Sequence, residues 1–394
     1  MKILLVNDYP VPVGGAEIQQ LFLKEELRKR GYDARIFSTS AHLSVKEKGM
    51  ADYQCFGTTS PFRTLLQVAN PWAYWKLKRV LKEFKPDVVH VRLFLTQISP
   101  IILPLLKKTP TLYHIVWYRP ICPTGTKLLP DNTPCYLTQG KVCYSRGCLP
   151  LRDWIPLMLQ AKLFRRWKKS FRLFVTCSEH VKKRLVEEGF EPVEVIMNGI
   201  RDIPKCVHIL STPIVSFAGR MVREKGVDVL LRAFSEVIKH VPEAKLILAG
   251  DGPKRKELET MARQLGASNN VTFLGHIPRE KLEEVFSSSW VQVIPSIWEE
   301  PFGNVALEAM ARGTVVVASS AGGLKEIIEH GKTGFLVPPG NVELLKETLL
   351  YILKNPDLIE RIGKEGRRVI LERFNMESYI QQFIKLYNRL LVRE

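Results

Sequence analysis

The sequence predicts an α/β protein of two Rossmann-like, doubly wound domains that face each other across a cleft. Three observations support this prediction. The chain has 394 residues, too many for one ordinary hydrophobic core and suited to two domains of about 150–200 residues. Predicted strands and helices alternate with short connections, which is typical of parallel sheets with right-handed crossovers. The alternation stops at residues 201–213, which read as a linker, and then starts again.

In the first half, the apolar run at residues 2–9 predicts a buried strand, and residues 14–32 have the apolar spacing of an amphipathic helix. Residues 120–150 are rich in Pro, Gly and Cys and predict a loop. The other predicted elements are strands at 33–40, 86–92, 110–117, 172–178 and 193–200, and helices at 72–84, 153–169 and 179–189.

The second half repeats the alternation. It predicts strands at 213–220, 244–250, 271–276, 290–296 and 314–320, and helices at 226–240, 255–266 and 305–312. We therefore expect an N-terminal domain at residues 1–205 and a C-terminal domain at 206–375. Residues 376–394 should form a helix that packs back on the N-terminal domain. In doubly wound folds, ligands bind at the carboxyl ends of the strands.

The charge of the chain is concentrated in its first half. The formal net charge is +18, and residues 1–200 hold 31 Lys and Arg against 16 Asp and Glu. This asymmetry indicates an anionic partner, such as membrane lipid, nucleic acid or a phosphorylated substrate, although a solubilising surface is the alternative. No apolar run reaches the ~20 residues of a membrane span. The N-terminal run is too short for a signal peptide, so we expect an intracellular chain.

Two glycines follow the first predicted strand, in "VPVGGAE". Gly14 and Gly15 leave the backbone open where a helix begins, so an anion can approach the helix N-terminus. The alternative is an ordinary tight turn. After the first strand of the second half comes "AGRMVREKG", in which Arg220 and Lys225 could grip a diphosphate from two sides. A solvated loop is the alternative there.

Two glutamates flank the start of a helix in "SIWEEPFGNVALEAMARG". Glu308, two turns inside the helix, could accept hydrogen bonds from a vicinal diol such as a ribose, and Glu300, in the preceding loop, could meet a sugar. The free N–H groups around Gly303 and Asn304 add donors for ligand oxygens. An exposed helix and loop is the alternative for this motif.

Four cysteines fall within the predicted loop: Cys122, Cys135, Cys143 and Cys148. Four thiolates can hold a structural zinc ion in a tetrahedral site. The spacing is not that of paired short knuckles, so unliganded thiols and disulfides remain alternatives, the latter disfavoured in an intracellular chain.

Taken together, these motifs resemble the retaining glycosyltransferases of family four, also called glycosyl transferases group 1, which have the GT-B fold. The second half carries the most specific matches: "SFAGRMVREKGVDVLLRAF", "LILAGDGP", "VTFLGHI", "IPSIWEEPFGNVALEAMARGTVVVAS", "AGGLKEII" and "GKTGFLVPPGN". The first half matches more loosely, in "GGAE", "PDVVHVR", "TLYHIVW", "VTCSEH" and "IMNGI". The family usually has Asp directly after "NGI", whereas here Arg201 precedes Asp202.

The resemblance implies roles for individual residues. Glu308 would bind the ribose of a nucleotide-sugar donor, Glu300 would face the transferred sugar, and Arg220 and Lys225 would hold the diphosphate. The donor site would be completed by residues of the same motifs and by the glycine pair: Gly14, Gly15, Ile277, Phe302, Gly303 and Asn304. His114 matches a histidine that the family places beside the donor sugar, although a lone strand histidine is more often a packed residue; His90 is a weaker candidate. "CPTGTKLLPDNTPC" resembles a cysteine-bearing insertion of some family members.

The predicted function is therefore transfer of a sugar from a UDP- or GDP-sugar to a glycan or lipid-linked acceptor, in cell-surface polysaccharide or glycolipid synthesis. The resemblance implies retention of configuration, and a lysine–arginine clamp could replace a catalytic metal. The alternatives are a sugar-nucleotide epimerase of similar fold, which the Arg–Lys and "EPFG" motifs fit poorly, and a basic nucleic-acid-binding protein. No nucleic-acid module is recognisable, so we expect no nucleic-acid partner.

A basic helix at residues 153–174 predicts a peripheral contact with the cytoplasmic face of a membrane. Apolar side chains crowd its first turns and cations its end, as in interfacial helices, although a core helix with a basic C-terminus is the alternative. The apolar residues are Trp154, Leu157, Met158, Leu159, Leu163, Phe164 and Trp167, and the cations are Lys162, Arg165, Arg166, Lys168 and Lys169.

Overall fold

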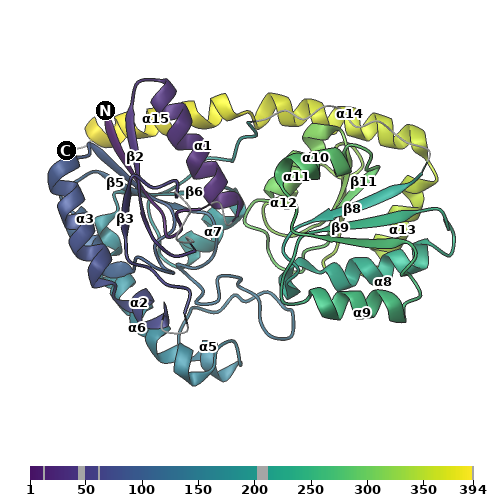
Figure 1. The fold of residues 1–394 in the computed structure, drawn as a ribbon, viewed down its shortest axis with the longest axis horizontal. Helices are drawn as coiled ribbons and strands as arrows, with labels where there is room; N and C mark the ends of the chain where they lie inside the picture. Colours follow the sequence, from purple (N-terminus) through teal and green to yellow (C-terminus); the bar gives the residue numbers. More distant parts are fainter. Residues whose placement is uncertain (12–13, 43–48, 61–62, 202–211, 393–394) are drawn as a thin grey trace. The chain divides into compact units, whose positions relative to one another are not determined.

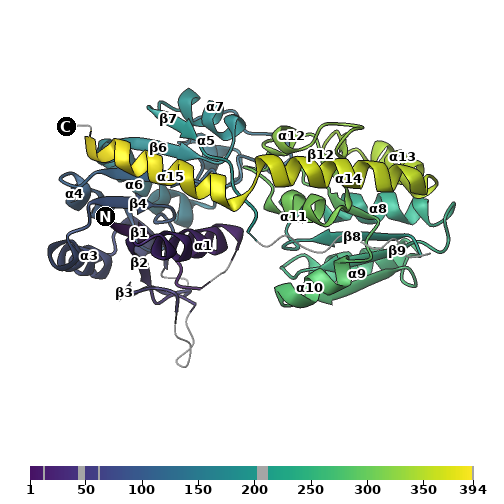
Figure 2. The same ribbon diagram turned by 90° about the horizontal axis from the view of Figure 1, so that it is seen from above.

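The computed structural model describes residues 1–11, 14–42, 49–60, 63–201 and 212–392. They form two compact units (Figures 1 and 2). Unit 1 comprises Met1–Asp131, Cys135–Asn198 and Glu377–Glu394, and unit 2 comprises Asn132–Pro134 and Gly199–Met376. The boundary predicted at residue 205 and the Asp202 position lie outside the described residues.

Unit 1 contains a seven-stranded parallel sheet in the order β3-β2-β1-β4-β5-β6-β7. Strands β2 and β3 lie on one side of β1, and β4 to β7 lie on the other. The direction in which successive strands are added therefore reverses between β1 and β4. Helices cover both faces, which is why β1 can be apolar without alternation. The strands are β1 (Lys2–Val6), β2 (Asp33–Thr39), β3 (Tyr53–Cys55), β4 (Val88–Val91), β5 (Thr111–Ile115), β6 (Leu173–Thr176) and β7 (Val193–Val195).

The helices of unit 1 come from the first half of the chain and from its C-terminal end. They are α1 (Gly15–Lys29), α2 (Arg63–Val68), α3 (Pro71–Phe84), α4 (Leu103–Leu106), α5 (Val142–Ser145), α6 (Leu151–Trp167), α7 (Glu179–Glu187) and α15 (Met376–Val392), with the 3-10 turns η1 (Pro100–Ile102) and η2 (Lys168–Ser170). Helix α15 covers the sheet of this unit, since Phe383 stacks on His90 of β4 at 5.0 Å between ring centroids.

Unit 2 contains a six-stranded parallel sheet in the order β10-β9-β8-β11-β12-β13. Here the order reverses between β8 and β11. The strands are β8 (Ile214–Ala218), β9 (Lys245–Ala249), β10 (Val271–Gly275), β11 (Val291–Ile294), β12 (Val315–Ser319) and β13 (Phe335–Val337). The helices are η3 (Arg223–Lys225), α8 (Val227–Val237), α9 (Arg255–Gln264), α10 (Arg279–Phe286), α11 (Asn304–Arg312), α12 (Leu324–Ile327), α13 (Val342–Leu353) and α14 (Pro356–Arg373).

The core of unit 2 shows why its helices are amphipathic. Val229, Leu230, Ala233, Phe234 and Val237 of α8 are buried against strand residues of the same hydrophobic cluster. Burial of the Val, Leu and Phe side chains contributes about 1.5–3 kcal/mol each. The two parallel, doubly wound sheets confirm the predicted fold class.

Several local predictions need correction. Strand β3 and helix α2 lie between the predicted strand at 33–40 and the predicted helix at 72–84, where we predicted no element, and α5 lies inside the predicted loop at 120–150. Two α6 side chains that we expected at a membrane surface, Leu157 and Phe164, are buried. Phe164 packs against Phe94 at 5.9 Å between ring centroids, so this face of α6 belongs to the core of unit 1.

Candidate active site

A partly buried ion pair lies at the carboxyl ends of the two central strands of unit 2. The Lys225 Nζ atom is 2.5 Å from Glu300 Oε1, and the Ser296 hydroxyl donates a 2.6 Å hydrogen bond to the same oxygen. Burial opposes ionisation of Glu300, but the Lys225 ammonium and hydrogen bonds from Lys225, Ser296 and Trp298 outweigh it and lower the pKa of this carboxyl. Glu300 is therefore a carboxylate at neutral pH.

The topology explains why residues 75 positions apart meet. Lys225 ends η3, which follows β8, and Glu300 lies in the loop that follows β11. Because β8 and β11 are parallel neighbours, their following loops emerge at the same edge of the sheet. Two glycines let backbone segments approach each other closely at this edge. A Cβ atom on Gly226, at φ +63°, would lie 2.0 Å from the Pro295 carbonyl oxygen. A Cβ atom on Gly322 would lie 2.1 Å from the Glu300 carbonyl oxygen.

Arg220 lies on the same edge but in a different environment. It follows β8 directly, and its guanidinium is 3.8 Å from Glu224. Its side chain is 71% exposed, whereas that of Lys225 is 21% exposed. Such a weak, exposed pair leaves the Arg220 side chain available to bind an anion, since exposed pairs contribute little stability.

The start of α11 adds further predicted donor-binding residues. Gly303 is the N-cap at φ +114°, Asn304 is the first helical residue, and the half-buried Glu308 follows one turn later. Phe302 is buried and packs against Phe374 at 6.1 Å between ring centroids. Ile277 is half-buried just after β10. The motif thus combines a helix N-terminus with a carboxylate in the second turn, a suitable frame for sugar and phosphate oxygens.

In unit 1, the predicted glycine pair begins α1. Gly14 is the N-cap and Gly15 is the first helical residue. Glu17, in the first turn, is buried, and its Oε2 atom would lie 3.3 Å from a Cβ on Gly14. Burial raises the pKa of Glu17 to about 7, although the backbone N–H groups of Glu17 and Gly14 and the charge of Arg92 act in the opposite direction.

The two candidate histidines lie side by side in unit 1. His114 of β5 and His90 of β4 are fully buried, with 3.3 Å between His114 Nδ1 and His90 Nε2. His90 Nδ1 is 2.7 Å from the Tyr387 hydroxyl of α15. Burial lowers the pKa of both imidazoles well below the usual value, and the Arg92 charge acts in the same direction. His114 is therefore a neutral imidazole beneath α15; its predicted catalytic role stays a prediction.

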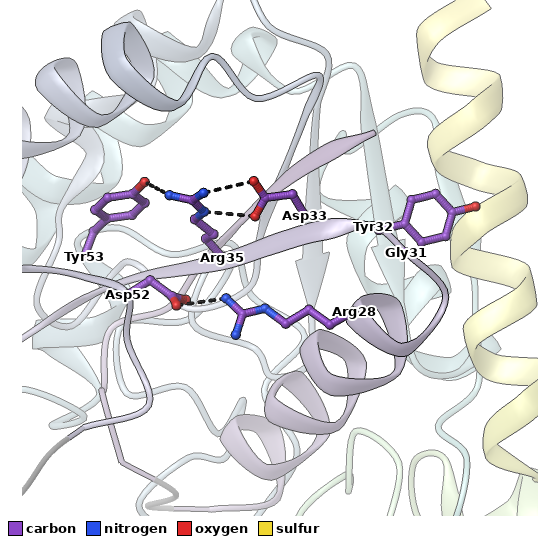
Figure 3. Close-up of a pocket in the computed structure, with 7 residues that line it drawn as sticks. All are labelled: Arg28, Gly31, Tyr32, Asp33, Arg35, Asp52 and Tyr53. Atoms are coloured by element: carbon purple, nitrogen blue, oxygen red, sulfur yellow. Dashed lines mark hydrogen bonds and ion pairs between the residues drawn. The ribbon is translucent and has the colours of Figure 1, made fainter.

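One hollow on the surface of unit 1 is not a candidate active site. It measures about 500 Å³ and is lined by residues at the start of β2 and β3 and the end of α1 (Figure 3). It therefore lies away from the carboxyl ends of the strands. Its charged groups are also paired, since Arg35 binds Asp33 at 2.9 Å and Arg28 binds Asp52 at 2.9 Å.

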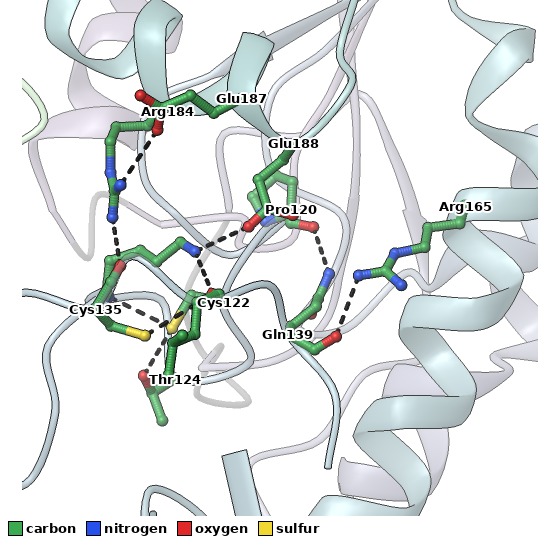
Figure 4. A network of polar contacts seen from close by, with 11 residues as sticks. Pro120, Cys122, Thr124, Cys135, Gln139, Arg165, Arg184, Glu187 and Glu188 are labelled. Atoms are coloured by element: carbon green, nitrogen blue, oxygen red, sulfur yellow. Dashed lines mark hydrogen bonds and ion pairs between the residues drawn. The ribbon is translucent and has the colours of Figure 1, made fainter. Parts of the chain in front are cut away.

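The four cysteines of the predicted zinc site line one small cavity of about 20 Å³ in unit 1. Figure 4 shows the sulfur atoms of Cys122 and Cys135 pointing toward one another, and the Lys127 backbone N–H donates to Cys122 Sγ at 3.4 Å. Among the described residues, Cys122, Cys135 and Cys143 form no disulfide. Within the described part of the chain, no group of three or more His, Cys, Asp or Glu side chains is arranged to hold a metal ion. The zinc site stays a prediction.

Sequence reasoning missed three residues of these sites. Ser296 and Trp298 both act on the Glu300 carboxylate, and both lie inside the motif that predicted Glu300. Glu17 lies inside "GGAE". Its position in the first helical turn was a usable signal, because carboxylates at that position interact with the helix N-terminus.

Comparisons with known proteins identify the family of the chain. A family model described as Glycosyltransferase Family 4 matches residues 13–202, and one described as Glycosyl transferases group 1 matches residues 202–369. An uncharacterized glycosyltransferase of Methanocaldococcus jannaschii is 37% identical, over 98% of each chain. Alpha-D-kanosaminyltransferase of Streptomyces kanamyceticus is 30% identical, over 45% of this chain and 46% of its own.

Solved structures share the fold over the whole chain. Sucrose-phosphate synthase from Thermosynechococcus elongatus has a TM-score of 0.79 and 23% identity, with 100% of each chain covered. Anabaena HepE in complex with UDP-glucose has a TM-score of 0.73 and 22% identity, with 99% of this chain and 100% of that chain covered. The two units thus have the GT-B fold. The chain belongs to glycosyltransferase family 4, and it is a glycosyltransferase.

Proposed function

We propose that this glycosyltransferase moves a sugar from a UDP- or GDP-sugar to a glycan or lipid-linked acceptor, with retention of configuration, in cell-surface polysaccharide or glycolipid synthesis. The observation that carries the proposal is the Lys225–Glu300 pair at the carboxyl ends of β8 and β11. A cation and a carboxylate at the point where the strand order reverses are placed where doubly wound folds bind nucleotides.

In this proposal, unit 2 holds the donor. Lys225 and Arg220 bind the diphosphate, Glu300 accepts hydrogen bonds from the transferred sugar, and Glu308 binds the ribose. Cleavage of the sugar–phosphate bond increases the negative charge on the leaving diphosphate, and fixed cations stabilise that charge in the transition state. Lys225 is already held in place by Glu300, so little reorganisation accompanies the reaction.

The cations also make a catalytic metal unnecessary in this proposal. Lys225 and Arg220 supply the positive charge that a divalent ion would give to the diphosphate. Gly14 and Gly15, at the N-terminus of α1, would offer backbone N–H groups to an anion in unit 1. The acceptor would bind to unit 1, whose basic sequence suits an anionic surface, and we place the enzyme on the cytoplasmic face of the membrane. Among the described residues, no helix is both long enough and apolar enough to cross a membrane.

A donor panel tests the proposal most directly. Purified protein is incubated with UDP- and GDP-sugars and candidate acceptors, the products are identified by mass spectrometry, and the anomeric configuration of the new bond is read by NMR. We expect one donor to be consumed, retention in the product, and equal rates with and without a chelator. Donor consumption by Lys225→Ala protein at the wild-type rate would contradict the assignment, and an inverted product would contradict retention.

A further inference from the structure

A row of exposed apolar side chains on α2, α3 and α6 of unit 1 lies outside the residues assigned to the candidate active site. We call it the apolar row: Leu65, Trp72, Trp75, Leu151, Ile155 and Leu159. Trp75 is 63% exposed, Leu65 is 65% exposed and Ile155 is 57% exposed. Exposed tryptophans of this kind, gathered with aliphatic side chains on adjacent elements, mark an interaction surface.

Helix α3 is turned so that its tryptophans must face outward. Ala73, Leu77, Val80 and Phe84 form its buried face. Trp72 and Trp75 lie away from this face, in the first and second turns. They are held in place by their neighbours, because Phe56 packs on Trp72 at 5.1 Å between ring centroids and Tyr74 packs edge-on against Trp75 at 5.3 Å. The tryptophans are thus presented on a rigid helix.

Helix α6 continues the row. Leu157, Gln160 and Phe164 are buried, so the outward face carries Leu151, Ile155 and Leu159, spaced four residues apart. Helix α2 connects the two segments: it precedes α3 and packs against α6. The Gln160 side chain of α6 donates a 2.6 Å hydrogen bond to the Gln67 carbonyl of α2. Figure 1 shows α3, α2 and α6 following one another along one side of unit 1.

Cations border the apolar row on both helices. Trp72 and Trp75 share a hollow of about 330 Å³ with Pro71, Lys76 and Arg79, and the Lys78 ammonium lies 5.0 Å from the Trp75 ring centroid. The exposed cations Lys162 and Arg166 follow Leu159 on α6. Glu83, the one acidic residue of α3, is paired with Arg79 at 2.7 Å. The border of the row is therefore strongly positive.

We infer that the apolar row is the surface by which unit 1 docks on an anionic lipid bilayer. Tryptophan and aliphatic side chains enter the headgroup boundary while lysine and arginine bind lipid phosphates, as in interfacial helices. A glycan-binding surface would instead surround the tryptophans with carboxylate and amide acceptors for sugar hydroxyls, and Trp72 and Trp75 are flanked by cations. The inference rests on the proposed use of a membrane-associated acceptor. It assigns the membrane contact to the exposed face of α6, whereas the sequence prediction also included side chains of the buried face.

Vesicle sedimentation with the full-length protein tests this inference. Vesicles of phosphatidylcholine with phosphatidylglycerol are compared with phosphatidylcholine alone, at low salt. We expect wild-type protein to sediment with the anionic vesicles and its tryptophan emission to shift to the blue. A Trp72→Ser, Trp75→Ser variant and a Lys76→Gln, Lys78→Gln, Arg79→Gln variant should each bind at least about tenfold more weakly.

The matched controls change an aromatic residue and a cation that are exposed on unit 2, Tyr351→Ser and Lys332→Gln, and should bind like wild type. Donor binding, measured in every variant, separates this inference from the proposed function: loss of vesicle binding with intact donor binding supports the docking surface alone. The inference is overturned if wild-type protein ignores anionic vesicles, if it binds both vesicles equally, or if a soluble glycan binds the tryptophans instead.

Discussion

Two buried glutamates, one in each unit, have opposite ionisation behaviour. Glu17 of α1 and Glu300 of the β11–α11 loop are 5% exposed each, and both lie near the carboxyl edge of their sheets. Burial raises the pKa of Glu17 to about 7, whereas the pKa of Glu300 is lowered despite its burial. The difference is a cation in direct contact, since Lys225 binds Glu300 and no ion pair of Glu17 occurs among the described residues. For these two glutamates, a cation in the segment after the neighbouring strand, more than the depth of burial, determines whether the carboxyl is charged.

The largest expected effect comes from removing that neighbour. Lys225→Met leaves the Glu300 carboxylate buried and unpaired, so we expect the free energy of unfolding to fall by about 3 kcal/mol at neutral pH. Transfer should fall by about 100-fold or more, because the fixed cation beside the leaving diphosphate is lost. Urea denaturation and steady-state kinetics measure the two effects.

A second substitution separates stability from function in this variant. Adding Glu300→Gln to Lys225→Met removes the unpaired charge, and we expect most of the stability to return while transfer stays impaired. A double variant as unstable as Lys225→Met would show that the pair contributes to stability through something other than charge.

Arg220→Ala gives the next largest effect, on activity alone. The Arg220 side chain is 71% exposed and only weakly paired, so the free energy of unfolding should change by less than about 0.5 kcal/mol. Loss of a charge-assisted contact of about 1.5–3 kcal/mol should reduce transfer by about 10-fold to 100-fold. Arg223→Ala is the matched control, because it removes an exposed arginine from the same segment. Equal rates for Arg220→Ala and wild type would remove Arg220 from the proposed site.

Glu17 provides a test by pH. Its folded-state pKa of about 7 lies above the ordinary 4.5, so between these values the folded protein binds more protons than the unfolded chain, and stability falls as pH rises. Glu17→Gln should remove this loss and raise the free energy of unfolding at pH 8 by about 1–3 kcal/mol, with little change at pH 4. Denaturation at several pH values measures this. A Glu17→Gln variant that is less stable at pH 8 would show that Glu17 is ionised and paired.

The smallest effect concerns the four thiols of the predicted zinc site, of which Cys143 resembles Glu17. Burial raises the pKa of Cys143, and a zinc ion would act on the four thiols as Lys225 acts on Glu300. If zinc binds, purified protein should contain about one metal ion per chain, and a strong chelator should lower the melting temperature by about 2–4 °C. Cys55→Ser, at a cysteine outside the cavity, serves as control. Metal-free protein with unchanged stability would exclude the site and favour free thiols.

Much of the candidate site was predictable because the sequence shows where along the chain each strand ends. Lys225 and Glu300 each follow a predicted strand, and parallel strands bring all such ends to one edge. The hydrogen bond from Ser296 was not predictable, because the loop conformation that directs its hydroxyl depends on close approaches at Gly226 and Gly322. The raised pKa of Glu17 was also not predictable, because it depends on which elements cover the side chain.

Helix α6 shows most clearly how far the sequence reaches. The sequence by itself determined that residues near 153–169 form a helix with an apolar start and a basic end, because periodicity and composition are local properties. It could not determine which apolar side chains face outward, because Leu151, Ile155 and Leu159 are as apolar as Leu157 and Phe164. Only the tertiary structure decided this, by packing Phe164 against Phe94 and Gln160 against α2. Burial depends on the neighbouring elements, and those neighbours come from distant parts of the chain.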